Sequence, residues 1–156
     1  MNLIHTRADE GDSHIIVDHL VTSKLKAAQT NNTYAVGEIR VPPQAGPPLH
    51  KHEPQETFYI LEGAFEFTTD TDTLIAQKGD LIHVPSNVPH TFKNISEQEG
   101  RILGFLSPVG MEQFFERVGV PYKGQPLTAK KPSLWQMLKF GLAAKRYGIS
   151  FVKPKK

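Results

Sequence analysis

Short, β-branched and partly alternating segments recur about every ten residues between residues 13 and 107. Turn-forming residues such as Asn31-Asn32, Glu62-Gly63 and Lys78-Gly79-Asp80 separate them. Regular spacing of this kind is typical of an all-β sandwich or barrel. We expect two strands within residues 13–28, and one each at residues 34–41, 57–61, 64–69, 73–76, 81–84, 90–94 and 101–106.

The length of 156 residues suits one domain with a hydrophobic core of its own. We expect a flexible, polar N-terminus at residues 1–12 and a barrel at residues 13–118. A C-terminal helical extension packed on the barrel should follow at residues 119–156. The short helices are expected at residues 111–118 and 134–147, the second with Ser133 as N-cap and Gly148 as its stop.

Composition excludes several classes of partner and site. The chain has no cysteine, so thiolate metal ligands are excluded, and its net charge of +2 does not require a nucleic-acid partner. The N-terminus has no signal-peptide run and no long apolar stretch follows, which predicts a cytoplasmic protein without a membrane partner. Residues 123–156 hold nine Lys or Arg and no Asp or Glu; we expect a solvated tail, with a membrane-surface or nucleic-acid contact as the alternative.

The candidate site begins at His50-Lys51-His52. Residues two apart on a strand point to the same side, so the two imidazoles converge. Glu56 follows after a short bend at the start of the next strand, and His90 comes from a strand further along the chain. Imidazole nitrogen and carboxylate oxygen together suit one divalent transition metal, namely manganese, iron, nickel, copper, cobalt or zinc.

Two longer patterns surround these residues. They are His50-x-His52-x3-Glu56-x6-Gly63 and Gly79-x5-Pro85-x-Asn87-x2-His90-x3-Asn94. They resemble the first and second motifs of the cupins, which fold as a double-stranded β-helix or jelly-roll barrel. Asn87 stands where glycine is commoner, and it fits because Asn tolerates left-handed backbone angles. Gln44 stands at the usual glycine position before the first His, which we interpret as a local loop variation.

The resemblance extends from about residue 13 to residue 154. The proline-rich lead-in at residues 42–50, the strand at residues 56–63 and the ending at residues 142–151 are similar to single-domain cupins related to quercetin 2,3-dioxygenases. The resemblance implies that His50, His52, Glu56 and His90 are the metal ligands.

Strand alternation places Phe58 and Ile60 on the face of Glu56, and Phe92 and Asn94 on the face of His90. We expect these four side chains to line an apolar substrate pocket, although such residues also fill ordinary barrel cores. Met111, Phe114 and Phe115 either cover that pocket or form the buried face of a helix.

The remaining candidates have simpler interpretations. His83 is expected to be structural, and His5, His14 and His19 lack ligand spacing, so they are predicted to be surface or core side chains. Trp135, Leu138 and Leu142 share one helical face, which we expect to dock on the barrel or on a partner subunit.

The resemblance implies a metal-dependent oxygenase that acts on a flavonol-like or other enolisable aromatic substrate. Glu56 would serve as ligand and as catalytic base. Two alternatives stay open: a metal-containing small-molecule binding or sensing module without turnover, and a cupin isomerase or lyase. Exposed sheet edges favour a homodimer, with the strands before residue 30 as the exchange elements.

Overall fold

The computed structural model describes residues 3–129 and 133–153. The chain forms strands β1 Asp12–Ile16, β2 His19–Leu25, β3 Ala35–Val41, β4 His50–Lys51, β5 Gln55–Glu62, β6 Ala64–Thr69, β7 Thr73–Gln77, β8 Leu81–Val84, β9 His90–Asn94, β10 Gly100–Ser107, β11 Val120–Pro121 and β12 Ser150–Phe151. A 3-10 turn η1 Ala27–Gln29 and helices α1 Met111–Val118 and α2 Leu134–Arg146 complete the order. The all-β prediction with two short helices is confirmed.

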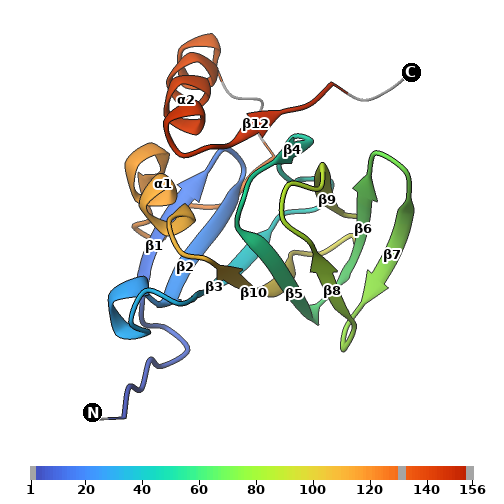
Figure 1. Cartoon of the computed structure of the whole chain (residues 1–156). Helices are drawn as coiled ribbons and strands as arrows, with labels where there is room; N and C mark the ends of the chain where they lie inside the picture. Colours follow the sequence, from blue (N-terminus) through green and yellow to red (C-terminus); the bar gives the residue numbers. More distant parts are fainter. Residues whose placement is uncertain (1–2, 130–132, 154–156) are drawn as a thin grey trace.

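The strands form two sheets that pack face to face (Figure 1). One has seven strands in the order β11-β1-β2-β3-β10-β5-β8, and the other has five in the order β12-β4-β9-β6-β7. All described pairings are antiparallel, as expected for a jelly roll. Among the described residues no strand pairing closes the two sheets into a continuous ring, so the barrel is a sandwich with its core between the layers.

Alternating burial along the long strands builds that core. In β10 the even-numbered positions from Gly100 to Leu106 are buried, while most of their neighbours are half-exposed. The inner faces of both sheets contribute to one cluster of buried side chains. Its members are Val41, Ala45, Phe58, Ile60, Phe65, Phe67, Ala76, Val84, Phe92 and Ile102.

The C-terminal segment forms a second, smaller core at one end of the sandwich. Helices α1 and α2 pack together there, and α2 leads into β12, which pairs with β4 so that Phe151 lies opposite His50 (Figure 1). The cluster consists of Leu106, Met111, Phe114, Ala144 and Ile149. The C-terminal segment therefore contacts the strand that begins the candidate site, while the division into residues 1–12, 13–118 and 119–156 stays a prediction.

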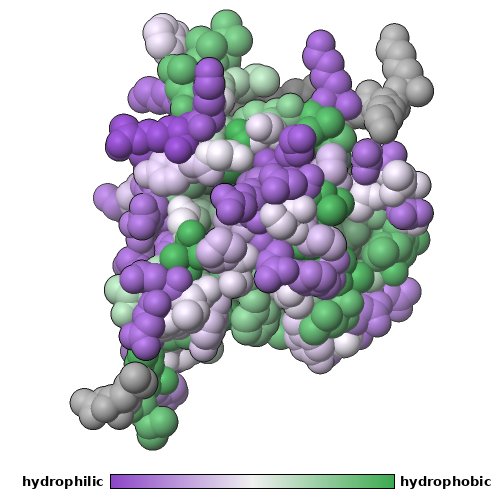
Figure 2. Space-filling model, viewed as in Figure 1, coloured by the Kyte–Doolittle hydropathy of each residue, from purple (hydrophilic) through white to green (hydrophobic). Residues whose placement is uncertain are grey.

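The apolar face of α2 does not dock on the sandwich. Trp135, Leu138 and Leu142 are 76%, 52% and 75% exposed, whereas Ala144 on the opposite side of the helix is buried. Figure 2 shows hydrophobic residues at the surface over α2, beside hydrophilic ones. Of the two expected partners for this face, the structure excludes the barrel. In the described part of the chain, neither helix has the length and apolar character required for a membrane span.

Candidate metal centre

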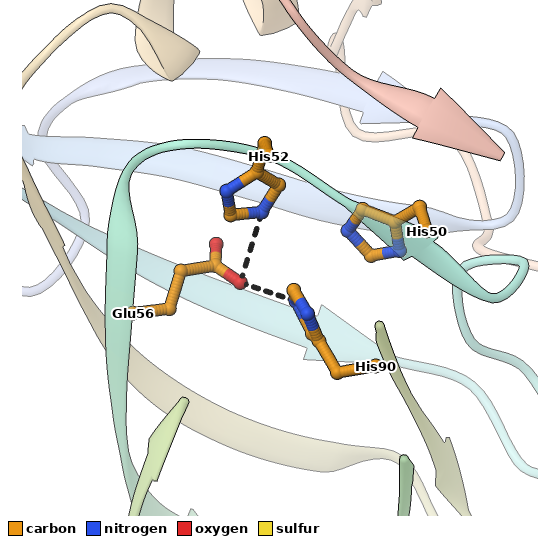
Figure 3. Close-up of side chains that lie close together, drawn as sticks. All are labelled: His50, His52, Glu56 and His90. Atoms are coloured by element: carbon orange, nitrogen blue, oxygen red, sulfur yellow. Dashed lines mark hydrogen bonds and ion pairs between the residues drawn. The ribbon is translucent and has the colours of Figure 1, made fainter. Parts of the chain in front are cut away.

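The four predicted ligands meet between the two sheets. His50 and His90 face each other as a register pair of β4 and β9, His52 follows β4 directly, and Glu56 is the second residue of β5 in the other sheet. A bend at residues 53–54 turns the chain between His52 and Glu56. One ligand atom from each residue lies within 4.8 Å of all the others (Figure 3). The structure therefore brings together all four residues that the motifs specify.

Each imidazole is fixed by the backbone in the same way. His50 Nδ1 lies 2.8 Å from the Pro48 carbonyl, His52 Nδ1 lies 2.7 Å from that of Pro54, and His90 Nδ1 lies 2.8 Å from that of Val88. A carbonyl oxygen only accepts, so each Nδ1 carries the hydrogen and donates it. The tautomer that results leaves the Nε2 lone pair of each ring free, which is the arrangement that orients histidine ligands at metal sites.

The centre of the cluster is rich in electron pairs. Glu56 Oε2 lies 2.8 Å from His90 Nε2 and 3.4 Å from His52 Nε2. His52 Nε2 is buried and has no hydrogen-bond partner among the described residues. Three nitrogen lone pairs and a carboxylate this close repel one another unless a positive charge lies among them. The site therefore requires a cation, either a proton or a metal ion.

The pKa values show how a proton meets this requirement. Burial opposes ionisation of Glu56, but the adjacent His52 and His90 outweigh it and lower the pKa of the carboxyl to about 2. Burial also opposes protonation of His90, yet Glu56 raises its pKa above the ordinary value. Burial, followed by the charge of His90, lowers the pKa of His50 to about 4. Without metal, Glu56 therefore stays ionised and favours the protonated form of His90, while His50 stays neutral near pH 7.

The donor set fits a divalent transition metal. Three neutral imidazole nitrogens and one carboxylate oxygen are ligands for manganese, iron, cobalt, nickel, copper or zinc. The buried Nε2 of His52 has no hydrogen-bond partner among the described residues, although buried polar atoms in proteins normally have one. A bound metal ion would be its partner. The set does not discriminate among these metals.

An apolar cavity adjoins His50 and Glu56. Its wall is mostly apolar and includes several aromatic rings, with Phe58, Phe92, Phe114, Phe115, Phe140 and Phe151 among the lining residues. Helix α1 contributes Met111, Phe114 and Phe115, of which Met111 and Phe114 are buried. Both interpretations of this trio hold, because it forms the packed face of α1 and also covers one side of the cavity.

Two of the four predicted pocket residues lie elsewhere. Phe58 and Phe92 line the cavity, whereas Ile60 and Asn94 are fully buried and do not line it. The Asn94 amide donates to the carbonyls of Val41 and Gln98, at 2.8 Å each, so it ties core strands together. Strand alternation identified the inward face correctly, but it does not tell how deep along that face a residue lies.

Among the cavity residues that were not predicted from the sequence, His19 is polar. Its side chain is buried and lines the same wall as His50 and Glu56. No ligand spacing marks it. The only local signal is Asp18 directly before it, in a turn between two strands, and a histidine beside a carboxylate is also common at protein surfaces.

Comparison with known proteins agrees with the fold and the motifs. The cupin domain family matches residues 37–105. An uncharacterised protein of Methanocaldococcus jannaschii is 32% identical over 109 residues, which cover 66% of this chain and 85% of that protein. The chain belongs to the cupin family. This cupin is also 35% identical over 121 residues to quercetin 2,3-dioxygenase of Bacillus subtilis, a match that covers 74% of the chain and 34% of the relative. It thus spans about a third of that enzyme's length.

Solved cupin structures share the architecture. KdgF of Halomonas superposes with a TM-score of 0.63 at 16% identity, covering 72% of this cupin and 99% of that chain. A predicted oxalate decarboxylase of Thermotoga maritima gives 0.62 at 22% identity, covering 68% and 100%. These similarities concern the fold alone, so the reaction has to be argued from the site.

Proposed function

We propose that this cupin is a metal-dependent oxygenase that acts on a flavonol-like or other enolisable aromatic substrate. The observation that carries the proposal is the position of His50 and Glu56 in the wall of an aromatic-lined cavity. A metal held by the four clustered residues would be accessible to a flat, apolar molecule in that cavity. The sequence similarity to quercetin 2,3-dioxygenase supports this substrate class.

His50, His52, Glu56 and His90 would hold the ion. When bound, a divalent metal supplies Lewis acidity that lowers the pKa of a substrate hydroxyl, and it offers open positions that bring reactants together. Glu56 serves as the base that takes the hydroxyl proton.

The cavity also disfavours one of the alternatives. A sugar or small polar acid needs several hydrogen-bonding partners, whereas the described residues of the lining offer polar side chains only at His19, His50 and Glu56. The isomerase or lyase alternative therefore has less support than the oxygenase. A binding or sensing module without turnover would use the same apolar cavity, so only measurement of turnover separates it from an enzyme.

Oxygen uptake tests the proposal directly. The protein is purified from unsupplemented medium, its metal content is measured, and oxygen consumption is followed with a panel of flavonols. We expect uptake that requires both the flavonol and the metal, and that stops when the metal is removed with a chelator. Metal-replete protein that binds flavonols but consumes no oxygen would favour the binding module. Metal-replete protein inert toward every flavonol and related enol would overturn the proposal.

A further inference from the structure

The cavity wall contains one polar side chain outside the four-residue cluster. Of the described residues that line it, only His19, His50 and Glu56 are polar, and His50 and Glu56 belong to the cluster. His19 is 6% exposed. A buried imidazole in an apolar wall costs free energy unless its polar atoms find partners. The ring nitrogens of His19 are therefore expected to have hydrogen-bond partners, either in the protein or in the cavity.

The partner of one ring nitrogen is known. His19 Nδ1 lies 3.0 Å from Asp18 Oδ1, and both side chains are largely buried. An ionised carboxylate only accepts hydrogen bonds, so Nδ1 donates and Nε2 is left with its lone pair. Nε2 makes no hydrogen bond within the part of the chain that the structure describes. The His19 and Phe92 rings also pack edge to face, with centroids 6.3 Å apart. In its neutral form, the imidazole therefore accepts a hydrogen bond at Nε2.

The turn that carries this pair is strained. Ile16 pairs with His19 across a two-residue turn formed by Val17 and Asp18. Val17 has φ of 61°, which is an outlier for a β-branched residue, since glycine or asparagine normally takes this position. Val17 also lines the cavity. Backbone strain persists at binding and active sites, so this outlier links the turn to the cavity.

We propose that His19 is a ligand-binding residue of this cavity, and that its Nε2 accepts a hydrogen bond from a hydroxyl group of a hydroxylated aromatic ligand. Asp18 is a positioning residue that holds the ring in the accepting tautomer. The inference rests on the proposed function, because it places the ligand in the cavity beside the metal. The inference also predicts a binding preference. Aromatic ligands with a second hydroxyl should bind more tightly than those whose single hydroxyl binds the metal.

Binding of two flavonols to metal-loaded protein without oxygen tests this preference. The probes are quercetin, which carries several hydroxyls, and 3-hydroxyflavone, which has only the metal-directed one. For His19→Leu we expect quercetin binding to weaken about tenfold and 3-hydroxyflavone binding to change by less than about twofold, because only quercetin loses a hydrogen bond. Metal content should equal that of the wild type. His83→Leu is the matched control, since His83 lies outside this cavity and pairs with Thr57.

The outcomes separate the two proposals. If wild-type protein binds both flavonols and His19→Leu weakens neither, or both equally, the role of His19 is wrong while the proposed function stands. If metal-loaded wild-type protein binds neither flavonol, the proposed function fails and this inference fails with it. Should His19→Leu not fold, His19→Phe keeps a planar ring without an acceptor and gives the same comparison.

Discussion

Glu56 and His90 form a hydrogen bond across the two sheets, with Oε2 of the carboxylate 2.8 Å from Nε2 of the imidazole. The contact joins β5 to β9, which belong to different sheets and are not hydrogen-bonded to each other. It means that the metal-free protein keeps its ligand atoms together with a proton in place of a metal ion. Metal binding therefore competes with this proton, so the metal affinity should depend on Glu56 and on the pH.

Replacement of Glu56 by Gln should abolish tight metal binding. The variant keeps the shape of the side chain but loses the only carboxylate of the cluster. Removal of a residue that only hydrogen-bonds to a metal-ligating side chain lowers metal affinity about 10- to 100-fold. Removal of a metal-ligating side chain itself should therefore lower the affinity by more than about 100-fold. Metal titration followed by calorimetry measures this. Glu53→Gln is the matched control, because Glu53 is exposed three residues earlier in the chain.

If Glu56→Gln retained both metal affinity and activity, the assignment of Glu56 as ligand and base would be wrong. If Glu53→Gln lost affinity equally, the effect would come from the net charge of the loop and not from coordination.

Metal affinity should fall as the pH falls. Glu56 raises the pKa of His90, so His90 carries a proton in the metal-free protein up to a pH above its ordinary value. A metal ion must displace that proton, and below the raised pKa the affinity should decrease about tenfold per pH unit. His50, with its pKa lowered to about 4, stays neutral and adds no further loss near neutral pH.

Calorimetric titrations between pH 6 and pH 8, in buffers of different ionisation enthalpy, measure both the affinity and the protons released. An affinity that does not change with pH, with no proton released, would contradict the protonation of His90 beside Glu56.

Much of the fold could be predicted from the sequence because alternation and caps are local signals. The expected strands agree with the structure within about two residues, which is the usual uncertainty of element ends. Helix α2 begins where Ser133 accepts a hydrogen bond from the Gln136 N–H. The strands β11 and β12 were not predicted, because two-residue strands exist only through tertiary pairing and leave no periodic pattern.

The candidate site was predictable to the extent that it is encoded in short spacings. Asn87 has φ of 61°, as expected for a residue at a glycine position, and Gln44 at the other glycine position also has a positive φ of 62°. The cavity was less predictable, because its walls combine the site strands β4, β5 and β9 with residues of β1, β2, β3, α1, α2 and β12, which meet only in the tertiary fold. For the same reason, periodicity identified the apolar stripe of α2 but not which side of the helix would be buried.

Asn94 should be important for stability and not for ligand binding. Its buried amide donates two hydrogen bonds, and its oxygen accepts one from the Ser96 N–H at 2.9 Å. Asn94→Leu leaves these backbone groups without partners, so we expect a loss of at least about 2 kcal/mol in the free energy of unfolding. Urea denaturation of metal-free protein measures it. If the variant were as stable as the wild type but bound flavonols more weakly, Asn94 would have a role in ligand binding instead.

The turn at Asn87 should discriminate between residues by their tolerance of left-handed backbone angles. Asn87→Val should lose about 1–2 kcal/mol of stability, because a β-branched side chain clashes at φ of 61°. Asn87→Gly is the control and should stay within about 0.5 kcal/mol of the wild type, since glycine adopts this conformation without steric cost. Thermal unfolding of both variants gives the comparison. Equal destabilisation would mean that the Asn87 side chain, and not its backbone angle, stabilises the turn.

The exposed face of α2 bears on the predicted homodimer. β1 pairs with β2 on one edge and, at His14 and Ile15, with β11 on the other, so only part of its outer edge is free. The apolar face of α2 was expected to pack on the barrel or on a partner subunit. Its side chains Trp135, Leu138 and Leu142 do not pack on the sandwich, so a partner subunit is the contact that remains to be tested. Light scattering should give twice the chain mass of 17.4 kDa, and Leu138→Glu should reduce it to one chain.

Ile75→Glu is the control, because Ile75 is 59% exposed on β7, in the strand at the edge of the other sheet. It should leave the dimer intact if α2 forms the interface. Dissociation by Ile75→Glu but not by Leu138→Glu would place the interface at the edge of β7 instead. A wild-type mass of one chain would contradict the homodimer altogether, and the apolar face of α2 would then have no partner among copies of this chain.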